Sequence, residues 1–347
     1  MILAGPRRLE DDRARAWSSV VELARARALA GPSSPAYTFL TDGESTTATL
    51  DYGELDLRAR RIAAAVQQRA GRAGRRVLLL YAPGLEYPAA FLGCLYAGAI
   101  AVPVYPPSPT RLKWSLPRLE SIIADADADL VLTTSDLAAM VPALAGAAPR
   151  LAALSWLATD QISPGTEDGW SDPAPGADDV AFLQYTSGST GAPKGVVLSH
   201  GNLLHNMDAV HRAFGNSPAT RGVIWLPPFH DMGLIGGILQ PLYGGFPVVL
   251  MSPLAFLERP LRWLEAMSRF RGTVSGGPNF AYDLCARKAD GADLSALDLS
   301  RWEVAFSGAE PVRAETLDRF AAAFAGCGFR REAFLPCYGL AEATLIV

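Results

Sequence analysis

The chain has 347 residues, of which 50% are hydrophobic and 19% are charged, a composition typical of a folded globular protein rather than a disordered one. Its formal net charge of −4 provides no overall attraction to nucleic acid or to an anionic membrane surface. This length exceeds that of one small core, so two domains or one large α/β domain are expected.

The N-terminal part of the chain predicts a helix and no membrane span. Only six residues precede the first charged residue, Arg7, so the sequence has no room for the apolar core of a signal peptide. Residues 7–30 have the pattern of a charged surface helix. The uncharged stretch 88–105 is interrupted by glycines and a proline, so a short buried helix followed by a buried strand is favoured over a membrane span.

The first half of the chain alternates between extended and helical patterns. Short runs rich in β-forming residues lie at 76–82, 99–104 and 128–134. Alternation of this kind is typical of βαβ units that build a largely parallel sheet. Residues 163–179 then gather prolines, glycines and acidic residues, the strongest linker signal in the chain. The sequence therefore predicts a first α/β subdomain over residues 1–175 and a second over residues 176–347.

The second half repeats the alternation. Extended segments are expected at 180–186, 195–199, 222–227, 246–251, 273–277, 303–308 and 334–339. Ser199 is a favoured cap residue and precedes a helical pattern over 200–214. Pro260 is expected in the first turn of another helix. The segment 312–326 predicts an amphipathic helix whose apolar stripe comprises Leu317, Phe320, Ala321 and Phe324.

The four cysteines, Cys94, Cys285, Cys327 and Cys337, lie in apolar surroundings without CxxC or His-Cys spacing. This pattern predicts buried thiols in a reducing compartment, with neither a zinc site nor a disulfide framework. A cytoplasmic location is therefore expected.

The segment 185–196, YTSGSTGAPKGV, combines glycines and hydroxyl residues with Lys194, one of only three lysines in the chain. A nucleotide-binding Walker loop needs Ser or Thr after its lysine and a helix directly afterwards, whereas Lys194 is followed by Gly195 and two valines. The segment therefore joins two extended stretches. Its glycines, hydroxyls and lysine suit phosphate binding, and the alternative is a flexible turn.

This segment resembles the phosphate loop of the adenylate-forming enzymes, the family of acyl-CoA synthetases, adenylation domains and luciferases. Three further segments resemble motifs of that family in the same order: Leu226–Gly233, Phe306–Pro311 and Cys337–Thr344. The segments at 101–107, 229–266, 276–285 and 336–345 narrow the resemblance to the fatty acyl-AMP ligase branch. The likeness extends from about Ala36 to the last residue.

The resemblance implies the fold of the N-terminal domain of these enzymes, an α/β fold with two βαβ-type subdomains whose mostly parallel sheets are packed with helices. It implies that a long-chain fatty acid and ATP react to give an acyl-adenylate and pyrophosphate, with Mg²⁺ as cofactor. The acyl group would then pass to the phosphopantetheine of an acyl carrier protein. Fatty acids are ionised at neutral pH, since carboxyl groups titrate near pH ~4, so no general base is required.

The resemblance also assigns roles to residues. The β- and γ-phosphates of ATP would be held by Thr186, Ser187, Gly188, Ser189, Thr190, Gly191 and Lys194. The adenine and ribose side would comprise Ser307, Gly308, Ala309, Glu310, Cys337, Tyr338, Gly339 and Leu340, with Tyr338 stacked on adenine. Glu342 would hold Mg²⁺. The acyl site would comprise His230, Met232, Gly233, Phe280 and Tyr282, and the catalytic set His230, Lys194 and Glu342.

Each of these residues also has a simpler interpretation. His230 could be a hydrogen-bonded structural residue, Tyr338 and the apolar residues core side chains, and Glu342 a solvated surface acid. The aspartate that binds ribose in the family, the hinge, and the small lid domain with its lysine match nothing before Val347, so we expect the lid to be absent and the 347-residue form to be weak or inactive alone. Two other functions stay open: a long-chain acyl-CoA synthetase, and a non-catalytic nucleotide- or acyl-binding module.

Overall fold

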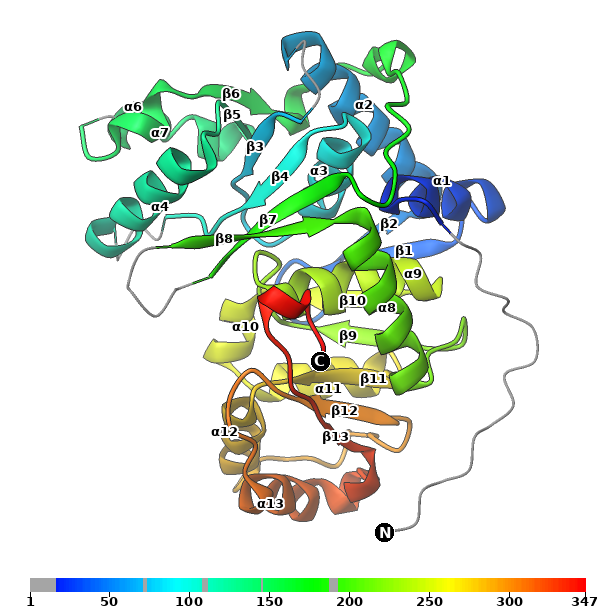
Figure 1. Ribbon diagram of the computed structural model, residues 1–347. Helices are drawn as coiled ribbons and strands as arrows, with labels where there is room; N and C mark the ends of the chain where they lie inside the picture. Colours follow the sequence, from blue (N-terminus) through cyan, green and yellow to red (C-terminus); the bar gives the residue numbers. More distant parts are fainter. Residues whose placement is uncertain (1–16, 71–73, 108–111, 145, 187–192) are drawn as a thin grey trace.

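A computed structural model describes residues 17–70, 74–107, 112–144, 146–186 and 193–347. Two sheets, each layered with helices, lie one above the other in Figure 1. All strand pairs within them are parallel except one at an edge of each sheet. The α/β class with two mostly parallel, helix-packed sheets is thereby confirmed.

The upper sheet has the strand order β6-β5-β3-β4-β7-β8 among the described residues. Its strands are β3 (Arg76–Leu79), β4 (Ile100–Pro103), β5 (Leu130–Thr133), β6 (Ser155–Ala158), β7 (Val180–Thr186) and β8 (Lys194–Ser199). The helices around it include α2 (Tyr52–Ala70), α3 (Glu86–Tyr96), α4 (Leu112–Ala126), α5 (Ser135–Ala138), α6 (Val141–Leu144) and α7 (Pro149–Ala153). The predicted run of buried helix followed by buried strand over 88–105 is confirmed by α3 and β4.

The lower sheet has the order β13-β12-β11-β9-β10-β1-β2. Its strands are β1 (Pro35–Leu40), β2 (Thr47–Asp51), β9 (Gly222–Ile224), β10 (Val248–Met251), β11 (Val274–Gly277), β12 (Val304–Ser307) and β13 (Phe334–Pro336). Its helices are α8 (His200–Phe214), α9 (Gln240–Gly244), α10 (Pro253–Glu258), α11 (Leu261–Arg269), α12 (Asn279–Ala289) and α13 (Ala314–Phe324), with α1 (Val20–Ala30) beside α8 and α9. A π-helix, η3 (Met232–Leu239), leads directly into α9.

Each sheet draws strands from both sides of residue 175. Strands β1 and β2 join the lower sheet through the parallel pairing of β1 with β10, and β7 joins the upper sheet by pairing with β4. The segment 163–179 is also not a free linker, because Glu167 forms an ion pair with Arg61 and the Trp170 indole donates to the Tyr96 carbonyl. The division into subdomains at residue 175 stays a prediction.

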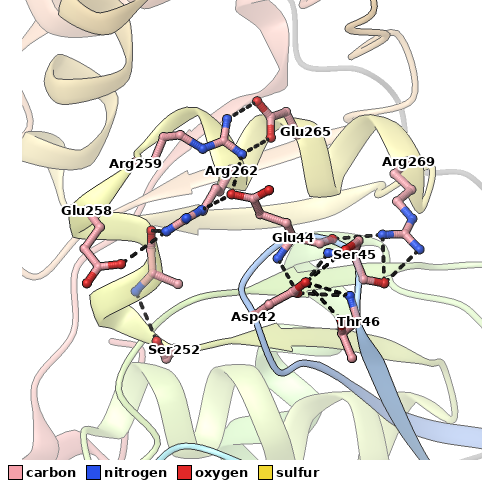
Figure 2. Close-up of polar contacts among 11 residues, drawn as sticks. Asp42, Glu44, Ser45, Thr46, Ser252, Glu258, Arg259, Arg262, Glu265 and Arg269 are labelled. Carbon is pink, nitrogen blue, oxygen red and sulfur yellow. Dashed lines mark hydrogen bonds and ion pairs between the residues drawn. The ribbon is translucent and has the colours of Figure 1, made fainter.

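The turn between β1 and β2 is fixed to α10 and α11 by a network of charges (Figure 2). The Asp42 carboxylate accepts hydrogen bonds from the backbone N–H groups of Glu44, Ser45 and Thr46. The Glu44 carboxylate forms ion pairs with the guanidinium groups of Arg259 and Arg262. Exposed pairs of this kind stabilise weakly, so the network chiefly fixes the position of the hairpin.

The cores follow from the apolar runs of the strands and the apolar faces of the helices. Leu317, Phe320 and Phe324 of α13 are buried, as the helical period predicts. All four cysteines are free thiols, three of them buried. Among the described residues, no helix is both long and apolar enough to cross a membrane.

Candidate functional site

A cavity of about 250 Å³ lies against the lower sheet and opens at the carboxyl ends of its strands. Around its mouth are residues that follow strands β9, β12 and β13: His230, Asp231, Gly308, Ala309, Cys337, Tyr338 and Gly339. Its interior is lined mainly by apolar residues of α8, η3, β9, β10 and β11. In open α/β sheets, ligands bind in crevices at the carboxyl ends of the strands, so this position is the expected one for a ligand site.

The loops after β12 and β13 approach each other closely at the mouth. The Cys337 N–H donates to the Ser307 carbonyl at 2.7 Å, and a Cβ at Gly308 would come within 2.9 Å of the Cys337 carbonyl oxygen. Ala309 adopts φ of 66°, a left-handed conformation that is uncommon for a residue with a side chain. Backbone strain of this kind clusters at ligand sites. Burial raises the pKa of the Cys337 thiol to about 11, which keeps it protonated at neutral pH.

The segment 337–347 folds back on itself beside the mouth. Gly339 pairs with Ile346 in an antiparallel bridge, and a Cβ at Gly339 would overlap the carbonyl oxygen of Leu345. Only glycine therefore fits there. Asn206 of α8 holds the end of the turn through hydrogen bonds to the backbone of Ala343 and Ile346. The Tyr338 side chain is 72% exposed, so its ring is open to a ligand at the mouth.

His230 is held by its neighbour Asp231. The His230 Nδ1 lies 2.6 Å from the Asp231 carboxylate, and the His230 side chain is 56% exposed whereas that of Asp231 is 13% exposed. This hydrogen bond raises the pKa of His230 above its ordinary value, against the opposing effect of burial. With Nδ1 occupied, Nε2 is left for a ligand, and the raised pKa favours the cationic form that attracts an anion.

The π-helix η3 fixes the loop that carries His230. A Cβ at Gly233 would overlap the carbonyl oxygen of Pro227, so glycine allows the first turn of η3 to press against that loop. The Leu234 N–H donates to the His230 carbonyl at 2.8 Å. Single stretches of π-helix occur frequently at functional sites. Met232, at the start of η3, lines the cavity. Its role in an acyl site stays a prediction.

The hairpin of β7 and β8 carries the glycine-rich segment on the upper sheet. Thr186 and Lys194 face each other as the last pair of its antiparallel ladder, and Lys194 is exposed. The Tyr185 hydroxyl donates to the Asp125 carboxylate at 2.6 Å, which anchors the hairpin to α4. The predicted strand–loop–strand arrangement, with no helix directly after the loop, is confirmed. Ser187, Gly188, Ser189, Thr190 and Gly191 lie outside the described residues.

Glu342 lies exposed in the short helix η6 (Ala341–Ala343). Its carboxylate has no hydrogen bond or ion pair with any other residue of the described part of the chain. Mg²⁺ in nucleotide sites is usually held by one or two carboxylates together with substrate phosphates and water. A single unpaired glutamate beside the cavity mouth therefore fits a magnesium ligand.

Several predicted site residues do not line the cavity. Glu310 instead accepts from the Phe280 N–H at 2.6 Å and so caps the start of α12. Tyr282 is fully buried among aromatic rings, and its hydroxyl donates to the Phe306 carbonyl, so its environment is that of a core residue. The others outside the lining are Gly233, Phe280, Ser307, Leu340, Glu342, Thr186 and Lys194.

Three residues at this site were missed by the sequence analysis. Asn206 lies nearly two turns inside α8, where nothing in the sequence marks it as different from a surface amide. Asn216 and Gln240 line the interior of the cavity, and both are buried. Only the position of Gln240 in a long apolar run, LIGGILQPL, offered a signal, because an amide there must be buried with its neighbours.

A family profile described as AMP-binding enzyme matches residues 25–347. The chain is 46% identical over 332 residues to the medium-chain-fatty-acid–[acyl-carrier-protein] ligase JamA of Moorena producens, covering 95% of this chain and 56% of that protein. It is 37% identical over 332 residues to the long-chain-fatty-acid–AMP ligase FadD28 of Mycobacterium tuberculosis, covering 93% of this chain and 57% of that protein.

Among solved structures, a similar one is the fatty acyl-adenylate ligase of L. pneumophila in complex with acyl adenylate and pyrophosphate. Its TM-score is 0.90 at 45% sequence identity, over 96% of this chain and 57% of that one. The chain thus spans a little over half the length of the relatives it matches.

Proposed function

The chain belongs to the AMP-binding enzyme family, in the fatty acyl-AMP ligase branch that the longer segments around its motifs indicated. On that basis we propose that it forms the main substrate-binding part of an enzyme that activates a fatty acid. The reaction joins the fatty carboxylate to the α-phosphorus of ATP and releases pyrophosphate. The phosphopantetheine thiol of an acyl carrier protein then attacks the acyl carbon of the acyl-adenylate, which forms a thioester and releases AMP.

One observation carries this proposal. A single cavity joins the residues predicted to surround adenine, after β12 and β13, to His230 and to an apolar interior that follows the lower sheet. An acyl-adenylate has the same order of parts: a planar base, a charged phosphate and an apolar chain. In this arrangement the base would lie at Tyr338 at the mouth, the phosphate near His230, and the acyl chain against the apolar lining within.

The reaction mainly requires that the two substrates are positioned and that the negative charge of the phosphates is neutralised. A carboxylate is already a nucleophile at neutral pH, so the difficulty is to bring it to a polyanion in line with the leaving pyrophosphate. His230, oriented by Asp231 and biased toward its cationic form, suits contact with the carboxylate or the α-phosphate. Lys194, together with the hydroxyl and glycine residues before it, suits the β- and γ-phosphates.

Mg²⁺ fits this site through Glu342, as described above. When bound, the ion offsets negative charge on the phosphate oxygens of ATP. Glu342 and Tyr338 lie on one folded segment, so the residue that would hold the metal and the ring that would stack on adenine are positioned together by the turn over 337–347.

ATP–pyrophosphate exchange dependent on fatty acid tests the proposal. We expect little exchange by the 347-residue chain and robust exchange by a version extended to the length of its relatives, because the family's lid lysine matches no residue here. Fatty acids of medium and long chain both belong in the assay, since JamA is named for the former and FadD28 for the latter. Absence of exchange by the extended version, with ATP still bound, would support the non-catalytic binding module instead.

The acceptor is tested separately. Incubation of the extended enzyme with fatty acid and ATP, in the presence of CoA and of a holo-acyl carrier protein, should give the acylated carrier protein as the main product. Predominant acyl-CoA would replace the acyl-AMP ligase assignment with that of a long-chain acyl-CoA synthetase. A cytoplasmic location stays a prediction.

A further inference from the structure

The inner end of the cavity contains two buried amides, and this feature bears on which fatty acid is used. The cavity extends from the carboxyl ends of the lower strands to their amino ends, since Gly222, Val248 and Val274, the first residues of β9, β10 and β11, all line it. A strand of four residues spans about 13 Å, so the cavity is deep as well as apolar. Asn216 and Gln240 also line the cavity, and they belong to the segments that lead into the amino ends of β9 and β10, which assigns them to its inner end.

Both amides are buried and incompletely bonded. Gln240 is 3% exposed and Asn216 is 4% exposed. Within the part of the chain that the structure describes, neither the Oε1 nor the Nε2 of Gln240 has a hydrogen-bond partner, and the Nδ2 of Asn216 has none. A buried polar group left without a partner costs about 1–3 kcal/mol each. Native proteins leave few such groups, so each one calls for an explanation.

The backbone that carries each of these amides is held in place by a hydrogen bond. Asn216 follows Gly215, which ends α8 in a left-handed conformation, and its N–H donates to the His211 carbonyl. Gln240 is the residue at which η3 passes into α9, and its own N–H bonds the Ile235 carbonyl. Both residues are buried in the cavity wall and extend from a backbone that is itself hydrogen-bonded.

The apolar lining around the two amides offers them no hydrogen-bond partner, so only a polar atom of a ligand or water could pair with them. The nearby lining consists of Val210, Phe214, Pro241, Phe246 and Val248, none of which has a side chain that hydrogen-bonds. A saturated acyl chain that filled this end would exclude water and leave both amides unpaired. A hydroxyl or carbonyl oxygen on the chain would pair with them, since together they offer donors and an acceptor.

We infer that this inner end is a polar subsite, and that the preferred substrate class is a fatty acid with a hydroxyl or keto oxygen on the distal part of its chain. This inference rests on the proposed function, because it places the acyl chain in the cavity. Gln240 and Asn216 are then specificity-determining residues that take no part in the chemistry at the carboxylate.

The test uses acyl-adenylate analogues with a sulfamoyl group in place of the phosphate, titrated calorimetrically into the 347-residue chain. One analogue carries a saturated chain, and a series of the same length carries a hydroxyl moved one carbon at a time along the distal half. We expect one position of the hydroxyl to bind about tenfold or more tightly than the saturated chain. Equal binding across the series, which would mean that ordered water satisfies the amides, overturns the inference.

Variants assign the preference to the two amides. Gln240→Met and Asn216→Leu keep the approximate size of each side chain, and each should bring the affinity ratio of hydroxylated to saturated analogue close to one. Ile224→Val, which removes one methyl group from the lining, should affect both analogues alike and leave the ratio unchanged. Retention of the preference by both amide variants would contradict the assignment.

Thermal unfolding of the ligand-free proteins provides a second readout. Replacing an unpaired buried amide by an apolar side chain of similar size should leave the melting temperature unchanged or raise it. A marked fall in both amide variants would mean that the amides support the fold, and would overturn the subsite. If no analogue of either kind binds, the proposed function fails rather than the subsite.

Discussion

Asn206 and Ile346 are joined by two hydrogen bonds, in which the Asn206 Nδ2 donates to the Ile346 carbonyl at 2.9 Å and the Ile346 N–H donates to the Asn206 Oδ1 at 3.2 Å. A third bond runs from Nδ2 to the Ala343 carbonyl at 3.2 Å. Because α8 begins directly after β8, with Ser199 and Asn202 in a capping box, this side chain couples the phosphate hairpin to the segment that carries Tyr338 and Glu342.

Asn206→Leu should therefore weaken nucleotide binding. It removes three hydrogen bonds to a backbone turn, at a cost of about 2 kcal/mol, and releases the position of Tyr338 and Glu342. Calorimetric titration with ATP and Mg²⁺ should show affinity at least tenfold lower than that of the unmodified chain. Asn202→Ala on the same helix should cost about 1 kcal/mol of stability through its cap without this loss of affinity. If the Asn206 variant binds ATP as tightly as the unmodified chain, the turn over 337–347 keeps its conformation without the Asn206 side chain.

Asp231→Asn should lower the pKa of His230. The Asp231 carboxylate stabilises the protonated imidazole, and an amide in its place provides no charge. The pKa is measured by NMR titration of the His230 ring protons, which must be assigned among four histidines. If the titration of His230 is the same in both proteins, Asp231 orients the ring without tuning its charge.

Lys194→Ala should lower the affinity for ATP without lowering the affinity for an acyl-adenylate. Lys194 is assigned to the β- and γ-phosphates, which an acyl-adenylate lacks. The substitution should weaken ATP binding about tenfold or more and leave the affinity for an acyl-adenylate analogue unchanged. Lys288→Ala, at an exposed position on α12, serves as the matched control and should change neither. Loss of both affinities in the Lys194 variant would place this lysine elsewhere in the site.

His200 should make the folded chain sensitive to acid. Its Nδ1 accepts a hydrogen bond from the Val20 N–H at 3.3 Å, and burial lowers its pKa to about 4, with Asp179 opposing the effect. Between pH 6.5 and 4 the unfolded chain binds a proton here that the folded chain does not, so stability falls as the pH falls through that range. Such a difference in pKa corresponds to at most about 3 kcal/mol.

The measurement for His200 is urea unfolding at pH 7 and at pH 4.5. His200→Gln keeps an acceptor for Val20 and removes the titration, so it should lose less stability on acidification than the unmodified chain. His205→Gln, at an exposed position on the same helix, should leave the pH dependence as it is. Identical acid losses for the unmodified chain and the His200 variant would show that another group dominates.

Much of the fold was predictable because strands such as β5, β10 and β11 are short, fully buried runs with helical patterns between them. The membership of the sheets was not, because β1 and β7 pair with strands distant in sequence and nothing local specifies those partners. The π-helix was missed as well. Its sequence, MGLIGGIL, is apolar throughout and shows no period by which to assign a helix.

The candidate site was predictable where a motif supplied several residues at once. His230, Met232, Gly308, Ala309, Cys337, Tyr338 and Gly339 were expected from their motifs, and the structure brings them to one cavity. The resemblance assigned Tyr282 to the acyl site as well, yet a large aromatic on a helix is as well suited to the core, where the structure places it. Asn216 and Gln240 were missed because their significance lies in buried amide atoms that have no partner among the described residues, which only the packed structure shows.

The central claim is that one cavity holds both halves of an acyl-adenylate. A crystal structure of the chain with an acyl-adenylate analogue tests this most directly. We expect adenine to lie against Tyr338, beside Gly308 and Ala309, and the acyl chain to extend past His230 along β9 and β10 toward Gln240. An acyl chain outside this cavity, or adenine remote from Tyr338, would contradict it.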